Sequence, residues 1–312
     1  MPAYRPQFPH IVDISGVNAS AEARPMPMTT DTSRAETAQS TGGAPLVDFA
    51  GKSNPYVDYQ SIDLLLSLQH PRSPGYDETC FFIMGQVKEL LFKALHFELY
   101  NAQLQLTKDC VDNACEILVR AKAYAQYITS SWDVLSTISP AGFNEFRDYL
   151  GTASGQLSFM YRHVEFVLGN KSARLASAFK NMPHVWPGIH AALHSRSLYD
   201  EAIALLSRRG HAINQAALER DWSQPYSVNA SVEQAWSKVY EDPAPGNDLY
   251  RLAEALVALS DQISQYRWRH FVSVQRLIGF KAGTGGSAGV GWLQHVTEHR
   301  HFPELWSIRT DF

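Results

Sequence analysis

The sequence predicts an all-α protein, a helical bundle that encloses a ligand pocket. Apolar residues recur at helical spacing in many segments after residue 55, and no segment shows the strict alternation of a half-buried strand. Hydrophobic residues make up 45% and charged residues 19% of the 312-residue chain, enough apolar material for a large core. Helices that bury one face each must pack on one another, and a pocket between them is the natural ligand site.

The first 50 residues differ in composition from the rest. They are rich in Ala, Ser, Thr, Pro and Gly and show little apolar periodicity. We therefore predict a disordered N-terminal tail at residues 1–50 and a single all-α domain at residues 51–312. Pro/Gly loops near residues 183–188 and 243–246 do not resemble domain linkers, because helical patterns resume within a few residues.

The predicted helices follow from their apolar spacing and their boundary residues. Ile62, Leu65, Leu66 and Leu68 share a helical face that ends before Pro71 and the Pro74–Gly75 turn. Asp77 and Glu78 suit the positive end of a long helix that runs to about Lys108. Further helices are predicted at about residues 110–129, 139–150, 154–168, 196–208, 230–240 and 247–281.

The net charge and the hydropathy of the sequence argue against several classes of binding partner. The net charge of −4 gives no electrostatic reason to expect nucleic acid or an anionic membrane surface. No apolar run approaches the roughly 20 residues of a membrane span. The N-terminus lacks a basic region followed by an apolar one, so no secretory signal is expected.

The cysteines indicate a reducing compartment. Three of them, Cys80, Cys110 and Cys115, are too few and odd in number for a disulfide framework, which predicts a cytoplasmic protein. No Cys-x-x-Cys-His sequence occurs, so covalent haem attachment of that type is excluded. Cys80 is interpreted as a small buried residue, with a thiolate ligand as the alternative.

The stretch from Tyr266 to Leu293 is the most informative in the chain. It begins as a helix with His270, Val274, Leu277 and Ile278 on one face. A glycine-rich loop follows, with Gly283, Gly285, Gly286 and Gly289 around Thr284. A histidine on an apolar face is either a core residue or a metal ligand. The loop lacks the ending of a phosphate loop, so this stretch alone predicts only a ligand site.

Several long motifs occur in one order: YVDYQSIDLLLSLQ, DETCFFIMGQVKELLFKALHFEL, FNEFRDYLGTASGQLSFMYRHVEFVLGNK, RWRH, VQRLIGFKAGTGGSAGVGWL and FPELWSIRT. They span about Tyr56 to Thr310 and resemble the tryptophan 2,3-dioxygenase family. These enzymes are haem-dependent and open the pyrrole ring of tryptophan with O₂. The resemblance implies a haem pocket inside the helical bundle and one haem b per subunit of a homotetramer.

The resemblance also implies roles for individual residues. His270 matches the axial ligand of the haem iron, and Ser154 and Gly155 match residues beside the haem. Arg147 matches the arginine that holds the substrate carboxylate, for which a guanidinium is well suited. Thr284 matches the threonine that binds the same end of the amino acid.

Aromatic residues complete the implied substrate site. Phe81 matches an aromatic residue that packs on the indole, and Tyr56 and Tyr59 match tyrosines that reach in from a neighbouring subunit. Each of these aromatic residues has plain core packing as its alternative.

Two positions depart from the family pattern. Gly85 stands where the family has a distal histidine that hydrogen-bonds the indole N–H, so no catalytic residue is assigned there. Glycine inside a helix costs about 1 kcal/mol relative to alanine, which space above the iron would offset. Phe143 stands where the family has tyrosine and removes a hydroxyl from the pocket.

The functional hypothesis is therefore a haem-dependent oxygenase. It would cleave the indole C2–C3 bond of L-tryptophan, or of a substituted tryptophan, with O₂ to give N-formylkynurenine or an analogue. Two alternatives stay open. One is a haem monooxygenase that modifies tryptophan or another indole in secondary metabolism, and the other is a non-catalytic haem- or gas-binding protein.

Two histidine groups are rival metal sites. His295 and His299 have the i, i+4 spacing of a zinc-binding pair, with Glu298 and His301 nearby. However, a distant third ligand is not evident. His184, His190 and His194 lie around a Pro/Gly loop and form a weaker pattern.

Overall fold

The computed structural model describes residues 28–51 and 54–312, and the predicted tail residues 1–27 lie outside the described part. The described residues contain helices and no β-strand, which confirms the all-α prediction. None of these helices is long and apolar enough to cross a membrane. Among the described residues, contacts between Cα atoms separate residues 28–70 from a larger unit that comprises residues 71–312.

The smaller unit contains three short helices, α1 (Asp31–Ser40), α2 (Pro55–Gln60) and α3 (Ile62–Leu66). Helix α1 has no buried residue, and its capping box on Thr30 is what defines its start. A left-handed Ser61 (φ +52°) separates α2 from α3. The predicted boundary between a disordered tail and a domain at residues 50 and 51 stays a prediction.

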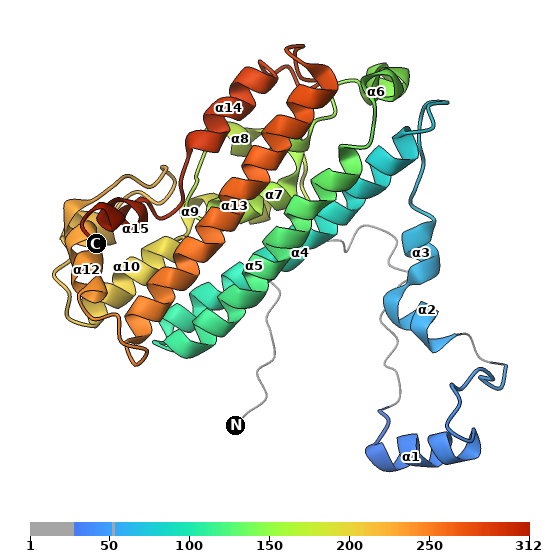
Figure 1. Ribbon diagram of the computed structural model, residues 1–312, viewed down its shortest axis with the longest axis horizontal. Coiled ribbons are helices and arrows are strands. Elements are labelled where there is room, and N and C mark those ends of the chain that lie inside the picture. The colour runs from blue at the N-terminus through green and yellow to red at the C-terminus, as the bar shows by residue number, and fades with distance from the viewer. Residues whose placement is uncertain (1–27, 52–53) are drawn as a thin grey trace. The chain divides into compact units, whose positions relative to one another are not determined.

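Three long helices form the frame of the larger unit, α4 (Glu78–Thr107), α5 (Val111–Leu135) and α13 (Asp248–Ile278). They run along one another, and α5 contacts both α4 and α13 (Figure 1). Leu95, Leu99 and Leu118 are completely or almost completely buried between them. Gln262 on α13 donates a 3.0 Å hydrogen bond to Thr129 on α5, which fixes the register of that pair.

Shorter helices cover this frame. Helix α7 packs on α4, α14 packs on α13, and α10 also contacts α4 (Figure 1). Buried Glu304 ties the C-terminal segment to the rest by accepting hydrogen bonds from Tyr199, Tyr226 and the Asn229 backbone. The remaining α-helices are α6 (Pro140–Arg147), α7 (Phe159–Val167), α8 (Ala173–Ala176), α9 (Trp186–His194), α10 (Leu198–Arg208), α11 (Gln215–Leu218), α12 (Ala230–Tyr240), α14 (Val290–Glu298) and α15 (Pro303–Ser307). Four 3₁₀ turns span Asp148–Leu150, Gly155–Leu157, Ser177–Phe179 and Ile308–Thr310.

Two helix predictions were wrong for identifiable reasons. Helix α5 does not end near residue 129 but continues to Leu135. The hydroxyls of Thr129, Ser130 and Ser131 bond back to carbonyls three or four residues earlier, so these residues are accommodated inside the helix. Helix α9 begins inside the Pro/Gly stretch for which a loop was predicted. It can form there because Pro187 lies in its first turn, where proline is tolerated.

The core contains a pair of buried histidines, His96 on α4 and His163 on α7. Their ring centroids are 5.0 Å apart. Both ring nitrogens of His163 and Nδ1 of His96 have no hydrogen-bond partner within the described part of the chain. Burial lowers the pKa of His96 to about 3, with a further contribution from His163, and lowers that of His163 to about 4. Both rings are therefore neutral in the folded protein at neutral pH.

We expect this pair to make the protein acid-labile. Unfolded histidine takes up a proton below its ordinary pKa of 6.5, whereas the folded rings resist protonation until about pH 4 or below. The free energy of unfolding should thus fall as the pH drops from 6.5 towards 4, by up to about 1.4 kcal/mol per pH unit for each histidine. Urea titrations at several pH values measure this slope. The His163→Leu variant should have a shallower slope, and an equal slope would contradict the assignment.

Candidate functional site

A cavity of about 680 Å³ lies inside the larger unit, and we call it the His270 cavity. Its walls come from α4, α5, α6, α7 and α13, from the loop after Leu150 and from the loop after α13. Eight of the residues singled out in the sequence line it together: Phe81, Gly85, Phe143, Arg147, Ser154, Gly155, His270 and Thr284. The fold thus brings residues from four distant motifs to one space.

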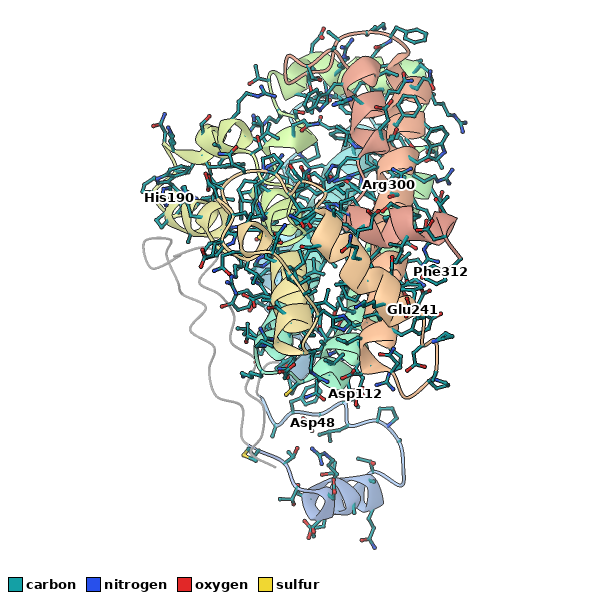
Figure 2. All side chains as sticks on the ribbon, turned by 90° about the vertical axis from the view of Figure 1, so that its left-hand side faces the viewer. Asp48, Asp112, His190, Glu241, Arg300 and Phe312 are labelled. Carbon is teal, nitrogen blue, oxygen red and sulfur yellow. The ribbon has the colours of Figure 1, made fainter. Side chains whose placement is uncertain are left out.

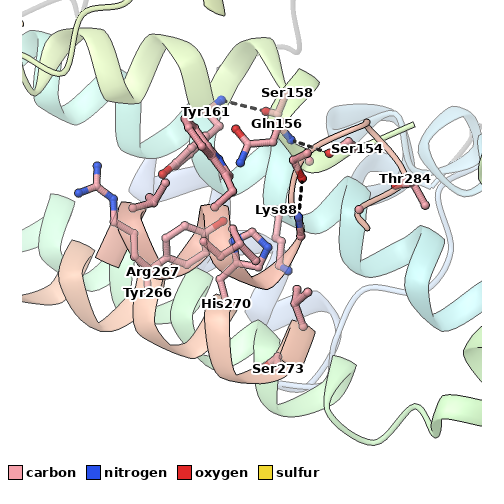
Figure 3. A pocket seen from close by; sticks show the side chains of 18 of the residues that line it. Lys88, Ser154, Gln156, Ser158, Tyr161, Tyr266, Arg267, His270, Ser273 and Thr284 are labelled. Atoms are coloured by element: carbon pink, nitrogen blue, oxygen red, sulfur yellow. Dashed lines mark hydrogen bonds between the residues drawn. The ribbon is translucent and has the colours of Figure 1, made fainter. Parts of the chain in front are cut away.

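His270 enters the cavity from α13 (Figure 3). Its ring stacks on Trp132 of α5, with centroids 4.5 Å apart and planes 12° apart. No hydrogen bond to its ring nitrogens occurs among the described residues. Burial, and then the nearby Lys88 charge, lower the pKa of His270 to about 3. His270 is therefore a neutral imidazole with a free lone pair, which is the form that binds metals.

The helix that carries His270 has defined ends. The Asn247 side chain caps its start by accepting from the Tyr250 N–H at 3.2 Å. Gly279 (φ +58°) ends it in a conformation that favours glycine. Between these ends, a buried apolar face fixes the rotation of α13 against α5, and this rotation directs His270 into the cavity.

The glycine loop after α13 joins the cavity wall formed by residues 147–155. Arg147 Nη2 donates a 2.7 Å hydrogen bond to the Ala282 carbonyl, and the Thr284 hydroxyl donates to the Ala153 carbonyl at 2.6 Å. Arg147, Ser154 and Thr284 therefore lie at one end of the cavity, and a polar end group of a ligand would meet all three.

Glycine is required in this loop at two positions. A Cβ at Gly285 would lie 2.6 Å from Ser154 Cβ, so only glycine allows this approach of the loop. Gly289 has φ +61°, and a Cβ there would lie 2.4 Å from the Lys281 carbonyl oxygen. The glycines thus serve close packing of the loop against the cavity wall.

Aromatic side chains gather where α4 meets α6. Phe81 lies 6.0 Å from Phe143 and 5.3 Å from Phe146 between ring centroids. Phe143 is buried and presents no hydroxyl. Gly85 is one turn further along α4, and a Cβ added to it would meet nothing within 4 Å. This part of the cavity is apolar and has open space beside Gly85.

Lys88 and Trp132 are among the cavity residues that were not predicted from the sequence. Lys88 is buried, and its Nζ lies 3.2 Å from the centroid of the Trp132 ring. The signal for Lys88 was its spacing, because Phe81, Gly85, Lys88 and Phe92 lie on one face of α4 and all line the cavity. A lysine among apolar residues on one helical face indicates a buried polar site. No sequence signal distinguished Trp132 from an ordinary core residue.

A buried ion pair forms part of the cavity wall. Arg267 Nη2 lies 2.8 Å from Glu165 Oε1, and both side chains are almost fully buried. Burial opposes ionisation of Glu165, but the charges of Arg267, His301 and Arg162 together hold its carboxyl pKa well below the ordinary value. The pair is ionised at neutral pH and links α7 to α13.

Tyr56 and Tyr59 are not among the residues that line the cavity. They lie on α2 in the smaller unit and are 63% and 76% exposed. Their role in the pocket of a neighbouring subunit stays a prediction.

The rival metal sites are not supported within the described residues, where no group of three or more His, Cys, Asp or Glu side chains could hold a metal ion. His295 pairs only with Glu298, at 3.5 Å. His301 instead bonds the Leu168 carbonyl and lies 3.1 Å from Arg267 Nη2. His190 is exposed on α9 (Figure 2). Its ring centroid lies 4.6 Å from that of His194.

Comparison with known proteins gives one consistent answer. The family model described as tryptophan 2,3-dioxygenase matches residues 41–182 and 237–312. A protein of Cupriavidus necator named tryptophan 2,3-dioxygenase is 43% identical over 265 residues, which are 85% of this chain and 90% of that protein. A Ralstonia nicotianae protein named tryptophan 2,3-dioxygenase 1 is 42% identical over the same share of each chain.

A further relative extends the similarity to nearly the whole chain. A Burkholderia pseudomallei protein named tryptophan 2,3-dioxygenase is 38% identical over 308 residues, which are 99% of this chain and 94% of that protein. The matched regions include every cavity residue singled out above.

Proposed function

The chain belongs to the tryptophan 2,3-dioxygenase family, and from that premise we propose that it binds haem b through His270 and cleaves the C2–C3 bond of L-tryptophan with O₂. The product is N-formylkynurenine. One observation carries the proposal: eight residues with implied roles in haem or substrate binding converge on a single cavity around an unbonded histidine.

Features of the cavity support the haem proposal. His270 offers a neutral imidazole, and apolar side chains such as Leu135, Val274 and Leu277 line the space beside it. Trp132 Nε1 and Arg162 Nε are buried and have no hydrogen-bond partner within the described part. Such orphaned donors cost free energy, and a bound group with carboxylate oxygens would satisfy them. We infer one haem per subunit.

The division of labour follows from these residues. Bound haem iron supplies the redox chemistry that makes O₂ reactive, which no amino-acid side chain here provides. The chain supplies binding and orientation. Arg147 meets the substrate carboxylate in two parallel hydrogen bonds, and Thr284 contacts the same amino-acid end. Phe81 packs on the indole, and Ser154 and Gly155 lie beside the haem.

Gly85 shapes what binds at the indole end. It offers no hydrogen-bond acceptor to the indole N–H, and a buried unpaired donor costs about 1–3 kcal/mol. A water molecule in the open space beside Gly85 restores that hydrogen bond. The same open space favours a second candidate, in which a substituted tryptophan is the substrate and its substituent fills the gap.

The test is a product assay. Haem-loaded protein is reduced without oxygen, mixed with tryptophan and then exposed to O₂. We expect N-formylkynurenine, identified by absorbance and mass, and none from protein without haem. If tryptophan neither binds nor reacts while a ring-substituted tryptophan is opened, the second candidate replaces the first. If neither is consumed although O₂ or CO binds tightly, the chain is a gas-binding protein.

We further propose a homotetramer in the cytoplasm. Large apolar side chains on the long helices, such as Val119, Tyr127 and Trp268, are more than half exposed, as expected of a surface that other subunits cover. Cys80, Cys110 and Cys115 are unpaired thiols, as expected in a reducing compartment. Light scattering of the purified protein tests the tetramer.

A further inference from the structure

Lys88 is a buried cation without an anionic partner. Lys88 is only 8% exposed and lies on the face of α4 that lines the cavity. Its Nζ lies over the Trp132 ring, and no hydrogen bond or ion pair to it occurs among the residues that the structure describes. A buried ammonium is costly unless an acceptor or an anion compensates it. The aromatic ring compensates only part of that cost.

Two arginines that line the cavity, Arg267 and Arg147, already have partners. Arg267 pairs with Glu165 at 2.8 Å, and Arg147 bonds the Ala282 carbonyl at 2.7 Å. Arg162, which also lines the cavity, donates to the Gln156 carbonyl through Nη2 and keeps one unpartnered N–H at Nε. Lys88 differs from all three arginines in that no hydrogen bond or ion pair to it occurs within the described part of the chain. Figure 3 shows the Lys88 and His270 side chains entering the same region. Trp132 contacts both, with Lys88 over its ring and His270 stacked on it.

Gly85 leaves room that Lys88 can reach. The two residues are three apart and share the cavity face of α4, so they lie a little less than one turn, about 4.5 Å along the helix axis, from each other. The flexible four-carbon stem of lysine spans about that length. Because a Cβ at Gly85 meets nothing within 4 Å, the ammonium can move from the Trp132 ring into the space beside Gly85.

We propose that Lys88 is the hydrogen-bond donor to small ligands bound at the cofactor that His270 holds. This inference rests on the proposed function. An ammonium carries three donors and a full charge, so it favours a ligand with negative charge on the atom nearest to it. Lys88 thus supplies from one turn away the donor that glycine at position 85 cannot supply. Burial lowers the pKa of Lys88 to about 7, so the ammonium form that donates predominates below that pH.

The test uses fluoride as a small anionic probe of the haem-loaded ferric protein, followed by its absorbance spectrum. Lys88→Met keeps the length of the side chain and removes the donor, whereas Lys88→Arg keeps a donor. Lys93→Met is the matched control, because Lys93 is exposed on the same helix. We expect Lys88→Met to weaken fluoride binding by at least about tenfold, the factor expected for loss of a charged hydrogen bond. Lys88→Arg and the control should bind fluoride much as the parent protein does.

A second measurement does not depend on fluoride. In the ferrous CO complex, a nearby donor lowers the C–O stretching frequency, so Lys88→Met should raise it and Lys88→Arg should not. An intact Soret band in Lys88→Met with unchanged fluoride affinity and C–O frequency would overturn the donor role and leave the haem proposal standing. A six-coordinate low-spin spectrum that Lys88→Met abolishes would overturn it too, because Lys88 would then be an iron ligand. Absence of any Soret band in the parent protein would instead reject the proposed function.

Discussion

Replacing His270 with leucine is expected to abolish the Soret band of the haem-loaded protein. His270 is a neutral, unbonded imidazole that stacks on Trp132. His295 and His299 also line the cavity, but no ring contact between either of them and Trp132 occurs among the described residues. Without the His270 imidazole, the protein would lack the residue that we propose holds the haem iron. Absorbance spectroscopy of the purified variant after incubation with haem measures the loss.

The control for this variant is His163→Leu. His163 is buried but does not line the cavity, so its loss should leave the Soret band intact. The His270→Gly variant adds a rescue experiment, since free imidazole should enter the vacated space and restore the band. A normal Soret band in His270→Leu, or one that persists without added imidazole in His270→Gly, would show that another group holds the haem.

Replacing Arg147 with methionine is expected to lower kcat/KM for tryptophan by about 10²-fold or more. Removing one partner of a buried, hydrogen-bonded charge pair costs about 2–5 kcal/mol, and each 1.4 kcal/mol corresponds to a factor of ten. Arg147 lies at the polar end of the cavity, beside Thr284 and Ser154. Steady-state kinetics of product formation, at equal haem content, measure the effect.

The control for Arg147 uses the substrate as well as the protein. Tryptamine has the same indole but no carboxylate, so the parent protein and Arg147→Met should handle it equally. With tryptophan, the kcat/KM of Arg147→Lys should lie between that of the parent protein and that of Arg147→Met. Lysine keeps the positive charge but lacks the two parallel donors of the guanidinium. A loss of equal size for tryptophan and tryptamine would mean that Arg147 acts through the loop that it bonds at Ala282.

Much of the fold could be predicted from sequence where boundary signals were strong. The Pro74–Gly75 turn and the acidic residues after it placed the start of α4 within one residue, and its end was placed equally well. Helix α13 was placed within three residues at both ends. The end of α5 could not be predicted, because the hydroxyl bonds that accommodate Thr129, Ser130 and Ser131 depend on the helix already being formed.

In the candidate site, too, some residues could be predicted from the sequence and others could not. His270 could be found because the apolar face of its helix and the glycine loop after it are both visible in the sequence. That Thr284, Arg147 and Ser154 meet at one end of the cavity depends on contacts across more than 130 positions of the chain, which spacing does not encode. Lys88 was hidden for another reason, since a lysine on a helix usually faces solvent and here faces a cavity.

Because Gly85 leaves open space where the family has a histidine, the central question is whether both atoms of O₂ enter the product. We propose that the indole ring is opened in this cavity although position 85 carries no imidazole. The most direct measurement is a single turnover of haem-loaded ferrous protein with tryptophan and isotopically labelled O₂, followed by mass spectrometry of the product. We expect each product molecule to carry both labelled oxygen atoms. A product with a single labelled atom, or tryptophan recovered unchanged, would contradict it.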